Sequence, residues 1–545
     1  MSERKNLLAQ GGVLFLLLAV RACAFGFEYW PQLDDYIQYC NYMTNETFME
    51  LQQKVGLLAS RPLAGLADYF VWGQLFDHMI LGVFLISALY ILCVVLMRKL
   101  LSRYFRVSPL FMVIMALLPL GVEATYWMSA ASRIVMGLLC ACLAGLAFAW
   151  WLDRGKWYCG AVFALAMLLP FGFYEQSAIL AMTLVLGMGI LECRKRPRRA
   201  VLALWALPAV AVYFAIVGQL STGTVYASRM ELVLPNSDYY WNVFLPEVLK
   251  QVRTVFFEGN FYTLAKGFLR GLRLILGGEL LLWCLLPVLL SVLLGLLVWK
   301  EGERERKNKV PLALLAGFLL ALAPVTLFFV LANPWFSFRC AATSFAGIAL
   351  FCDTLVMALC GRLPAKRLCL SVLAGAAALV FTIAGATEIG DYKGTYESDH
   401  RAVQVIMQTL ERDDLLRKDT TSLRVGFLGM EPSHLPDQNY HWHEHVTGCT
   451  ESNWALSGLL RSQLPADTQL PGVYPLPTWP IYRNWNHAVN DPTLFDRLYW
   501  YDGHSATPIT LQPSGEKRYD VLLPDGTLLG RVVEQWDGTG YFEAP

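Results

Sequence analysis

Eleven apolar segments, separated by polar connectors, constrain the fold of this chain more than any other feature of its sequence. Crossing the hydrocarbon core of a bilayer takes about 20 apolar residues in a helix. The chain is 56% hydrophobic and only 16% charged, whereas a soluble domain carries about 25% charged residues. We therefore predict a mainly α protein, a polytopic transmembrane helix bundle of about 11 spans. The segments lie near 7–27, 78–97, 107–122, 134–152, 158–173, 177–191, 200–218, 281–299, 310–331, 342–360 and 368–386.

The connectors alternate in charge along the chain. One set is rich in Lys and Arg, and the short connectors of the other set carry one basic residue or none. Because cytoplasmic loops carry the excess of Lys and Arg, the alternation predicts the N-terminus inside and residues 387–545 outside. We expect a multi-pass protein of the cell membrane, and the net charge of +1 gives no reason to expect nucleic acid as a partner. The basic connectors contain Arg98, Lys99, Arg103 and Arg106; Arg154 and Lys156; Arg194, Lys195, Arg196, Arg198 and Arg199; Lys300, Arg304, Arg306, Lys307 and Lys309; and Arg362, Lys366 and Arg367.

Three parts of the chain are predicted to lie on the outer side. Residues 28–77 and 219–280 form long loops of a transmembrane domain that spans 1–386. Residues 387–545 have the composition of a soluble domain. Within the second loop, basic and aromatic residues interleave over 248–276, which favours a helix that lies in the membrane interface.

Residues 387–545 are predicted to form a small extracytoplasmic α/β domain. The pattern of 398–412 indicates a helix, and the apolar run at 423–430 indicates a buried strand. Residues 519–534 are typical of a hairpin around Pro524-Asp525-Gly526, because this turn sequence supplies the backbone angles that a tight reversal needs.

Two adjacent carboxylates, Asp34 and Asp35, follow the first span on the predicted outer side. Carboxylates are costly beside lipid and tend to be kept there for a task. Such a pair can orient a proton acceptor, hold a metal, or divide into acid and base roles. The structural alternative is an ordinary N-cap of a helix at the start of the loop.

The short outer turns each combine one or two charges with aromatic residues. Packing of the spans is expected to bring these turns together into one outward-facing pocket. There, carboxylates could activate a hydroxyl group, arginines could bind a phosphate bidentately, and aromatic faces suit a sugar ring or a lipid tail. The candidate residues are Arg61 in the first loop, Glu123 and Tyr126 in the second outer turn, Arg133 at the next span, Tyr174 and Glu175 in the third turn, and Arg339 in the fifth.

This layout resembles the C-type superfamily of polytopic membrane glycosyltransferases. The long loop after the first span carries Leu33-Asp34-Asp35-Tyr36 and Ser60-Arg61-Pro62, and later turns carry 123–127 and Tyr174-Glu175-Gln176-Ser177. These segments are similar to bacterial members, including the O-antigen glucosyltransferase-like group. The resemblance covers about 1–386 by layout and only short motifs by residue. Residues 387–545 resemble no family that we can name.

The resemblance implies a hexosyltransferase-type enzyme that takes a sugar from a polyprenyl-phosphate donor. Asp34 or Asp35 maps to the acidic motif of the superfamily, which implies a catalytic base or a metal contact. The implied reaction is an inverting transfer to a cell-envelope acceptor, which could be a glycan, a lipid or a protein. Placement makes Glu123, Tyr126, Tyr174 and Glu175 candidates for the acceptor and donor pocket, and Arg61, Arg133 and Arg339 candidates for phosphate binding. Some members use a divalent cation and others do not, so no cofactor is assigned.

Several alternatives stay open at the level of sequence. A transporter or flippase for a lipid-linked glycan or another solute would also be polytopic, and so would a non-catalytic envelope protein that binds a partner. Arg21, inside the first span, is a functional candidate or an ion-pair partner within the bundle. The run His441-Trp442-His443-Glu444-His445 could chelate zinc on a strand, but a polar loop is the default and we assign no metal site.

Overall fold

The computed structural model describes residues 3–39, 61–220, 231–301, 309–361, 363, 365–430, 443, 446–465, 468–478, 489–490, 494–534 and 539–543. The chain divides into two compact units. The first, here the helical unit, comprises Met1–Tyr29 and Thr47–Gly390. The second, here the mixed unit, comprises Trp30–Glu46 and Asp391–Pro545. The sequence assigned all of 28–77 to the transmembrane domain, but the segment with Asp34 and Asp35 belongs to the mixed unit.

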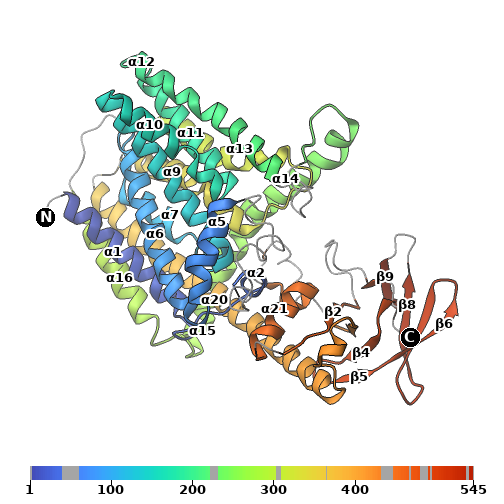
Figure 1. Cartoon of the computed structure of the whole chain (residues 1–545). Coiled ribbons are helices and arrows are strands. Elements are labelled where there is room, and N and C mark those ends of the chain that lie inside the picture. Colours follow the sequence, from blue (N-terminus) through green and yellow to red (C-terminus); the bar gives the residue numbers. More distant parts are fainter. Residues whose placement is uncertain are drawn as a thin grey trace. The chain divides into compact units, whose positions relative to one another are not determined.

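The helical unit is a bundle in which α1 packs against α16 and α6, and α6 packs against α9 (Figure 1). Short 3-10 and π-helical turns join several of its helices. The helices are α1 (Glu3–Ala22), α5 (Pro62–Ala67), α6 (Met79–Leu101), α7 (Pro109–Leu117), α8 (Val122–Thr125), α9 (Met128–Arg154), α10 (Trp157–Ala166), α11 (Glu175–Glu192), α12 (Pro197–Ala200), α13 (Ala206–Leu220), α14 (Leu245–Arg253), α15 (Gly267–Leu276), α16 (Leu285–Trp299), α17 (Val310–Leu322), α18 (Phe338–Ala341), α19 (Phe345–Cys360) and α20 (Lys366–Arg412).

Each of the eleven predicted segments contains helix, and the prediction of a mainly α protein is confirmed. In the described part of the chain, nine helices are long and apolar enough to cross a membrane, which is compatible with a multi-pass membrane protein. The segments near 107–122 and 158–173 form shorter helices because prolines interrupt them. Helix α7 has 9 residues and ends at Leu117, since the residue before Pro119 disfavours helical angles. Its length of roughly 14 Å is less than half of the hydrocarbon thickness.

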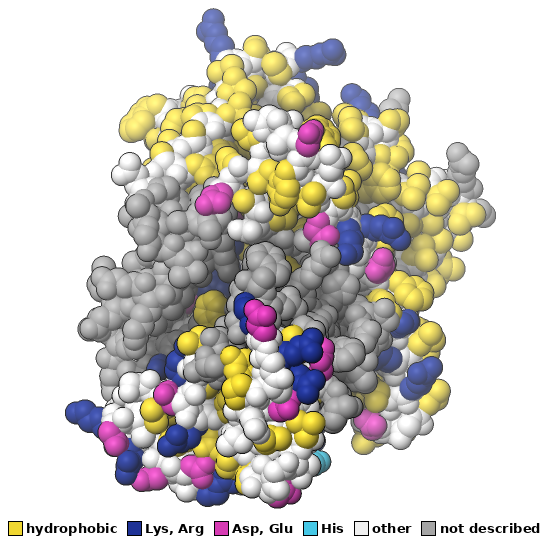
Figure 2. All heavy atoms as spheres, turned by 90° about the vertical axis from the view of Figure 1, so that its right-hand side faces the viewer, with side chains coloured by type: hydrophobic (Ala, Val, Ile, Leu, Met, Phe, Trp, Pro, Cys, Tyr) yellow, Lys and Arg dark blue, Asp and Glu magenta, His cyan; other side chains and the backbone are white. Residues whose placement is uncertain are grey.

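The exterior of the helical unit is rich in apolar side chains. Figure 2 shows hydrophobic side chains over the upper part of the molecule, which belongs to this unit, with Lys and Arg at its upper end. Helix α16 exposes a row of leucines, including Leu285 at 60% and Leu289 at 65%. In water such a surface would be strongly unfavourable, whereas in a bilayer it contacts lipid chains.

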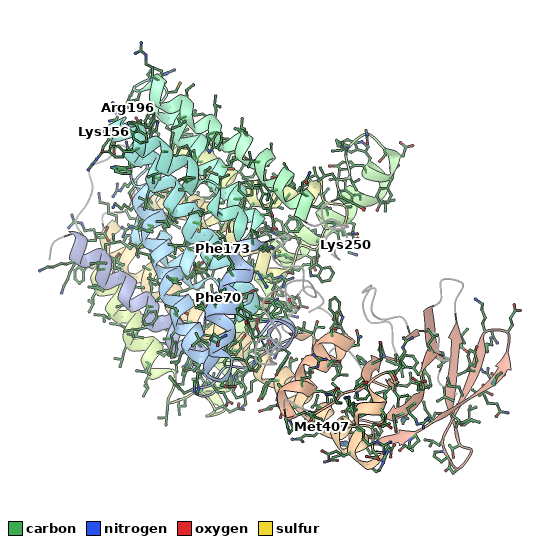
Figure 3. The ribbon with its side chains drawn as sticks, in the orientation of Figure 1. Phe70, Lys156, Phe173, Arg196, Lys250 and Met407 are labelled. Carbon is green, nitrogen blue, oxygen red and sulfur yellow. The ribbon has the colours of Figure 1, made fainter. Side chains whose placement is uncertain are left out.

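The basic connectors contact one another. Arg103 pairs with Asp153 at 2.7 Å, and Arg196 pairs with the same carboxylate at 2.8 Å. A second ion pair, of 2.6 Å, joins Arg98 to Glu301. Lys156 and Arg196 lie at the same end of the bundle in Figure 3. The spans therefore pack so that connectors predicted to share one side of the membrane come together.

The predicted orientation has a direct test in an exposed native cysteine. Among the cysteines in described residues, only Cys193, next to the basic connector Arg194–Arg199, is exposed. In intact cells carrying Cys40→Ser, we expect a membrane-impermeant maleimide to label Glu516→Cys, in the exposed turn between β6 and β7, but not Cys193. Permeabilised cells should label both. Labelling of Cys193 without permeabilisation would reverse the predicted topology.

The mixed unit combines helices with two sheets. Its helices are α2 (Asp34–Gln38), the end of α20 and α21 (Asn453–Gln463). The first sheet has the order β2-β1-β4-β5, and the second is antiparallel with the order β3-β9-β8-β7-β6. The strands are β1 (Arg424–Leu428), β2 (Gly472–Leu476), β3 (Val489–Asn490), β4 (Arg497–Tyr501), β5 (Ala506–Pro508), β6 (Thr510–Gly515), β7 (Arg518–Leu522), β8 (Leu528–Glu534) and β9 (Thr539–Glu543).

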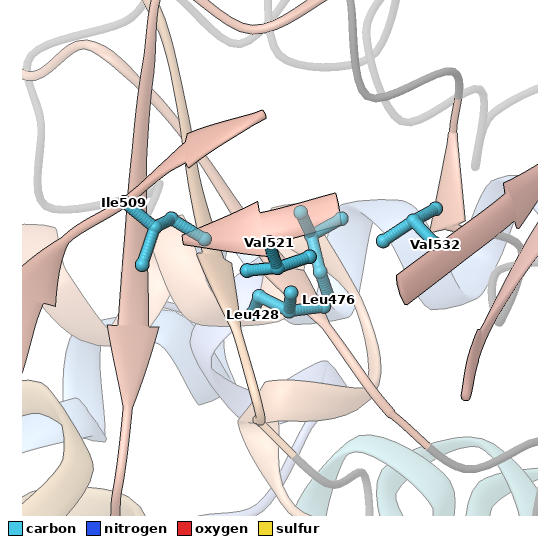
Figure 4. Close-up of a cluster of buried hydrophobic side chains, with 5 residues drawn as sticks. All are labelled: Leu428, Leu476, Ile509, Val521 and Val532. Carbon is cyan, nitrogen blue, oxygen red and sulfur yellow. The ribbon is translucent and has the colours of Figure 1, made fainter. Parts of the chain in front are cut away.

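The two sheets share one core. Leu428, Leu476, Ile509, Val521 and Val532 pack together, and they come from both sheets and the β5–β6 connection (Figure 4). Strand β1 is central and pairs in parallel with β2 and β4, which explains its continuous apolar sequence. The predicted buried strand and the predicted hairpin, β7–β8, are both confirmed.

The helix predicted at 398–412 is not a separate element. It is the end of α20, which runs without interruption for 47 residues from the last predicted span. No proline occurs in this stretch, and the charged residues after 387 are compatible with a helix in water, so nothing in the sequence ends the helix at the last span. The segment 248–276 is helical as predicted, through α14, two π-helical turns and α15.

Candidate functional site

Arg61 and Glu175 form the first contact between predicted outer turns. The Arg61 guanidinium donates to both carboxylate oxygens of Glu175, with its shortest bond, from Nη2 to Oε2, at 2.9 Å. It also lies 4.7 Å above the ring of Tyr174. Burial opposes the charged form, but the Glu175 carboxylate outweighs it and holds the pKa of Arg61 above its ordinary value. Arg61 therefore presents a fixed positive charge, and its side chain keeps 30% of its surface exposed.

Glu175 and Tyr174 are held by the start of α11. Glu175 is the first residue of this helix, where the helix dipole favours a negative charge. The Tyr213 hydroxyl donates to its carboxylate at 3.3 Å. Tyr174 is buried, and its hydroxyl lies 3.4 Å from the Cys340 sulfur. Burial raises the pKa of Tyr174 well above its ordinary value, so this phenol stays neutral.

Arg133 pairs with Asp68 in the interior. The Arg133 Nη2 donates to Asp68 Oδ2 at 2.7 Å, and the two side chains are only 7% and 1% exposed. Ser132 donates to the same carboxylate at 3.4 Å, and Arg133 also donates to the Ser129 carbonyl at 2.5 Å. A buried ion pair is tolerated when its polar atoms are bonded in this way. Arg133 was predicted as a phosphate ligand, and the structure gives its guanidinium a protein carboxylate as partner.

Glu123 joins the second and fifth of the predicted outer turns. Its carboxylate accepts from the Arg339 backbone nitrogen at 3.0 Å, in the first turn of α18, where unbonded N–H groups attract a carboxylate. The Arg339 guanidinium lies 5.1 Å above the ring of Trp127. Tyr126 is 1% exposed and packs against Tyr29 at a ring distance of 5.2 Å. Glu123 thus positions a half-buried arginine on an aromatic surface.

Several of the predicted outer turns therefore contact one another within the helical unit, and Asp34 and Asp35 do not belong to this unit. Arg61 from the first loop meets Tyr174 and Glu175, Tyr174 meets the turn with Cys340, and Arg339 meets Glu123 and Trp127. In addition, the Thr343 hydroxyl donates to Gln176 Oε1 at 3.0 Å. Phe173, labelled in Figure 3, packs against Ala64 of α5, which begins directly after Arg61.

Asp34 and Asp35 lie in the mixed unit and differ in environment. Both belong to the first turn of α2, and Leu33 is its N-cap residue, so neither is the N-cap that the sequence left open. Asp35 is fully buried, and its carboxylate accepts from the Gln32 backbone nitrogen at 2.9 Å. Asp34 is half-buried. Leu33 has a φ of 33°, a strained conformation for a branched residue that often marks functional sites.

A second buried carboxylate, Asp399, lies close to this segment. Both of its oxygens accept from the Cys449 backbone nitrogen, at 3.0 and 2.9 Å. Burial, followed by electrostatic interactions with Cys449 and Asp399, raises the pKa of the buried Tyr36 well above its ordinary value. Helix α21 approaches closely at Gly458, where an added Cβ would come within 3.0 Å of the Tyr36 backbone. The residues that follow Asp34 in α2 are therefore tightly packed.

Three buried aspartates, Asp68, Asp353 and Asp399, are not among the residues predicted for the site. Asp353 is buried in α19 and accepts from the backbone nitrogen and the hydroxyl of Ser108, the N-cap residue of α7. A single acidic residue within an apolar run, as at Asp353, is a sequence pattern that identifies a buried carboxylate of this kind. Arg21 donates to the Thr125 hydroxyl at 3.1 Å, so this intramembrane candidate connects α1 to α8.

The zinc hypothesis lies mostly outside the described residues, which include His443 but neither His441 nor His445. Within the described ranges, no group of three or more His, Cys, Asp or Glu side chains could hold a metal ion. No protein-family model matches the chain, and no curated protein matches it.

Proposed function

We propose that the chain is an integral membrane glycosyltransferase that takes a sugar from a polyprenyl-phosphate donor. The observation that supports this most is the convergence of outer turns in the helical unit, which combines arginines, carboxylates and aromatic rings. Charged groups at a lipid-facing bundle suit a substrate with an anionic head and an apolar tail. The acceptor is a component of the cell envelope on the outer face of the membrane.

In this proposal the reaction is an inverting displacement. The oxygen of the acceptor hydroxyl forms a bond to the anomeric carbon of the sugar, and its proton passes to the Asp34 carboxylate. The bond from the anomeric carbon to the phosphate oxygen breaks, and the polyprenyl phosphate leaves with the electron pair. A positioned base contributes about 10²–10⁴-fold to such a step.

The remaining residues divide into ligands and supports. Arg61 and Arg339 are the proposed phosphate ligands, because both are half-buried, charged and placed against aromatic rings. Glu175 and Glu123 position them, and Tyr126 and Tyr174 form part of the pocket wall. Arg133 supports the site through its pair with Asp68.

One specific observation favours the transporter alternative. The chain between Pro109 and Thr125 is a discontinuous helix, with a break at Pro119 and the buried Asp353 at its start. Broken helices and buried charges are typical of secondary transporters. Asp353, however, has a structural task, since it binds the N-cap residue of α7.

Transfer measured in detergent separates the two functions. Purified full-length protein is incubated with radiolabelled polyprenyl-phosphate sugars and a cell-envelope extract, and label in the acceptor is counted. An enzyme transfers the sugar without a sealed bilayer, whereas a transporter has no activity to measure there. Label that crosses proteoliposome membranes without any transfer in detergent would replace the proposal by the alternative.

Substitution of the proposed phosphate ligands is expected to weaken use of the donor. Arg61→Gln and Arg339→Gln should each lower kcat/KM for the donor about 10–100-fold, because each removes charged hydrogen bonds to the phosphate. Arg253→Gln is the matched control, since the Arg253 side chain is 75% exposed on α14.

A double variant tests whether Arg61 binds the phosphate or only neutralises the charge of Glu175. Arg61→Gln with Glu175→Gln leaves no unpaired charge, so it should fold normally and still lose use of the donor. Recovery of kcat/KM in the double variant would show that Arg61 serves only to neutralise Glu175.

A further inference from the structure

A continuous helical stretch of the helical unit carries three distinct faces. Residues 256–276, here the interface segment, run from two π-helical turns (Thr254–Gly259 and Phe261–Lys266) into α15. On one face every fourth residue is small and buried, namely Gly259, Thr263, Gly267 and Gly271. Residues at this interval share one face of a helix. The interface segment therefore packs against the bundle through a row of small residues.

The packed face contacts the outer ends of predicted spans. A Cβ at Gly259 would lie 2.8 Å from the ring of Phe338, in the fifth predicted outer turn, and 3.1 Å from Leu120, near the outer end of the third predicted span. A Cβ at Gly267 would lie 3.3 Å from the carbonyl oxygen of Ala384, near the outer end of the last predicted span. The interface segment thus crosses the bundle at the level of the predicted outer membrane surface.

The opposite face is apolar and exposed. Its outermost row again recurs at every fourth residue and consists of Phe257, Phe261, Ala265 and Leu269. Phe257 and Leu269 are 74% and 57% exposed. A flanking row of half-buried apolar side chains widens this surface and consists of Phe256, Leu264, Phe268 and Leu272. Such a face is unfavourable in water, whereas at a membrane it enters the boundary between headgroups and acyl chains.

Three basic residues follow one edge of the apolar face. Lys266 and Arg270 are half-buried on the flank opposite to the flanking apolar row, and Arg273 continues the outermost row and is exposed. The Lys266 Nζ lies 3.9 Å from the centroid of the Tyr262 ring, a cation–π contact that holds the ammonium group beside the aromatic surface. The positive charges therefore lie side by side with the surface that suits acyl chains.

The single acidic residue of the interface segment does not cancel this charge. It is Glu258, which lies 4.0 Å from Arg253 of the preceding helix α14. The edge formed by Lys266, Arg270 and Arg273 is therefore positive, and it complements an anionic partner at the membrane surface.

We propose that the interface segment binds anionic phospholipids of the outer leaflet, with headgroup phosphates against Lys266, Arg270 and Arg273 and acyl chains against the apolar face. Long basic side chains reach the headgroups from a helix in the interface, and arginine binds phosphate bidentately. A zwitterionic headgroup carries its own cation, which weakens this attraction, so the basic edge selects lipids with a net negative charge. No sugar donor or acceptor takes part, so the inference does not depend on the proposed function.

Site-specific photo-crosslinking tests this inference on the full-length protein. Leu269 is replaced by p-benzoylphenylalanine, and the protein is placed in nanodiscs with equal amounts of phosphatidylglycerol and phosphatidylcholine. After irradiation, the crosslinked lipids are identified by mass spectrometry. We expect phosphatidylglycerol adducts to exceed phosphatidylcholine adducts at least about threefold, because each basic side chain near the surface favours an anionic lipid. The triple variant Lys266→Gln, Arg270→Gln and Arg273→Gln should give equal amounts of the two adducts.

Two matched triple variants separate charge at this edge from other effects. Lys266→Arg, Arg270→Lys and Arg273→Lys keeps the three charges and should keep the preference for phosphatidylglycerol. Removal of three exposed cations from a predicted cytoplasmic connector should also leave the preference at position 269 unchanged; this variant carries Arg194→Gln, Lys195→Gln and Arg198→Gln.

A crosslinker at Leu289, exposed on α16, reports on lipid that contacts a span and should show no preference between the headgroups. Equal adducts of both lipids at position 269 of the otherwise unchanged protein would overturn the selection of anionic lipid. Lipid adducts at position 289 but none at position 269 would show that the interface segment does not lie against the membrane. A preference that survives the triple glutamine variant would remove the basic edge as its cause.

Discussion

Asp34→Asn is expected to lower sugar transfer by about 10²–10⁴-fold at an unchanged level of folded protein. The substitution keeps the shape of the side chain but removes the basic oxygen that accepts the proton of the acceptor hydroxyl. Asp34 is half-buried, so the loss of its charge should change the stability of α2 little. The measurement is transfer from a radiolabelled polyprenyl-phosphate sugar in membranes that carry equal amounts of each variant.

Asp35→Asn is the matched comparison and should behave differently. The Asp35 carboxylate is buried and accepts from the Gln32 backbone nitrogen. An amide at this position keeps one acceptor oxygen, but it removes the charge and buries an NH2 group, which costs about 1–3 kcal/mol of folding free energy. We expect less folded protein, with near-normal transfer per folded molecule. Asp238→Asn, at an exposed position of the loop predicted over 219–280, should change neither quantity. Full transfer by Asp34→Asn would exclude Asp34 as the base. Loss of transfer per folded molecule only in Asp35→Asn would make Asp35 the base and Asp34 the structural residue.

The bundle could be predicted because its signals are local. Apolar runs, prolines and basic connectors each act within about one helix length, and the ion pairs of Asp153 with Arg103 and Arg196 follow from the predicted grouping of connectors. The end of the last span was harder to predict. Helix α20 continues to Arg412, because a change from apolar to charged residues marks a membrane boundary but does not break a helix.

The pairing of site residues could not be predicted from the sequence. Glu123 accepts from the backbone of a residue 216 positions away, and Arg61 binds a carboxylate 114 positions away. Such partners depend on which helices pack together, and no periodicity records that choice. The different environments of Asp34 and Asp35 have the same origin, since α21 and the Asp399 segment bury one carboxylate and leave the other half-buried.

The pair of Asp68 and Arg133 is expected to give the largest effects on stability. Asp68→Ala leaves Arg133 buried without its carboxylate, which should cost about 3–5 kcal/mol. The side chains are 1% and 7% exposed, so water cannot replace the lost partner without a rearrangement. The free energy of unfolding is measured by titration with SDS in mixed micelles. Lys250→Gln removes a pair whose lysine is 61% exposed, and should cost about 0–1 kcal/mol.

A double-mutant cycle then decides what this pair contributes. Asp68→Leu with Arg133→Met removes both charges and keeps an apolar volume, so it should recover most of the stability that each single substitution loses. Transfer by the stable double variant distinguishes support from catalysis. If Arg133 serves only to hold α9 against the turn of Asp68, kcat/KM for the donor in the double variant should stay within about threefold of the wild-type value. That change is smaller than the tenfold change in rate that corresponds to about 1.4 kcal/mol. If kcat/KM for the donor falls 10-fold or more in the folded double variant, Arg133 is instead a phosphate ligand. The double variant keeps the packing, so the loss of activity would then come from the missing positive charge.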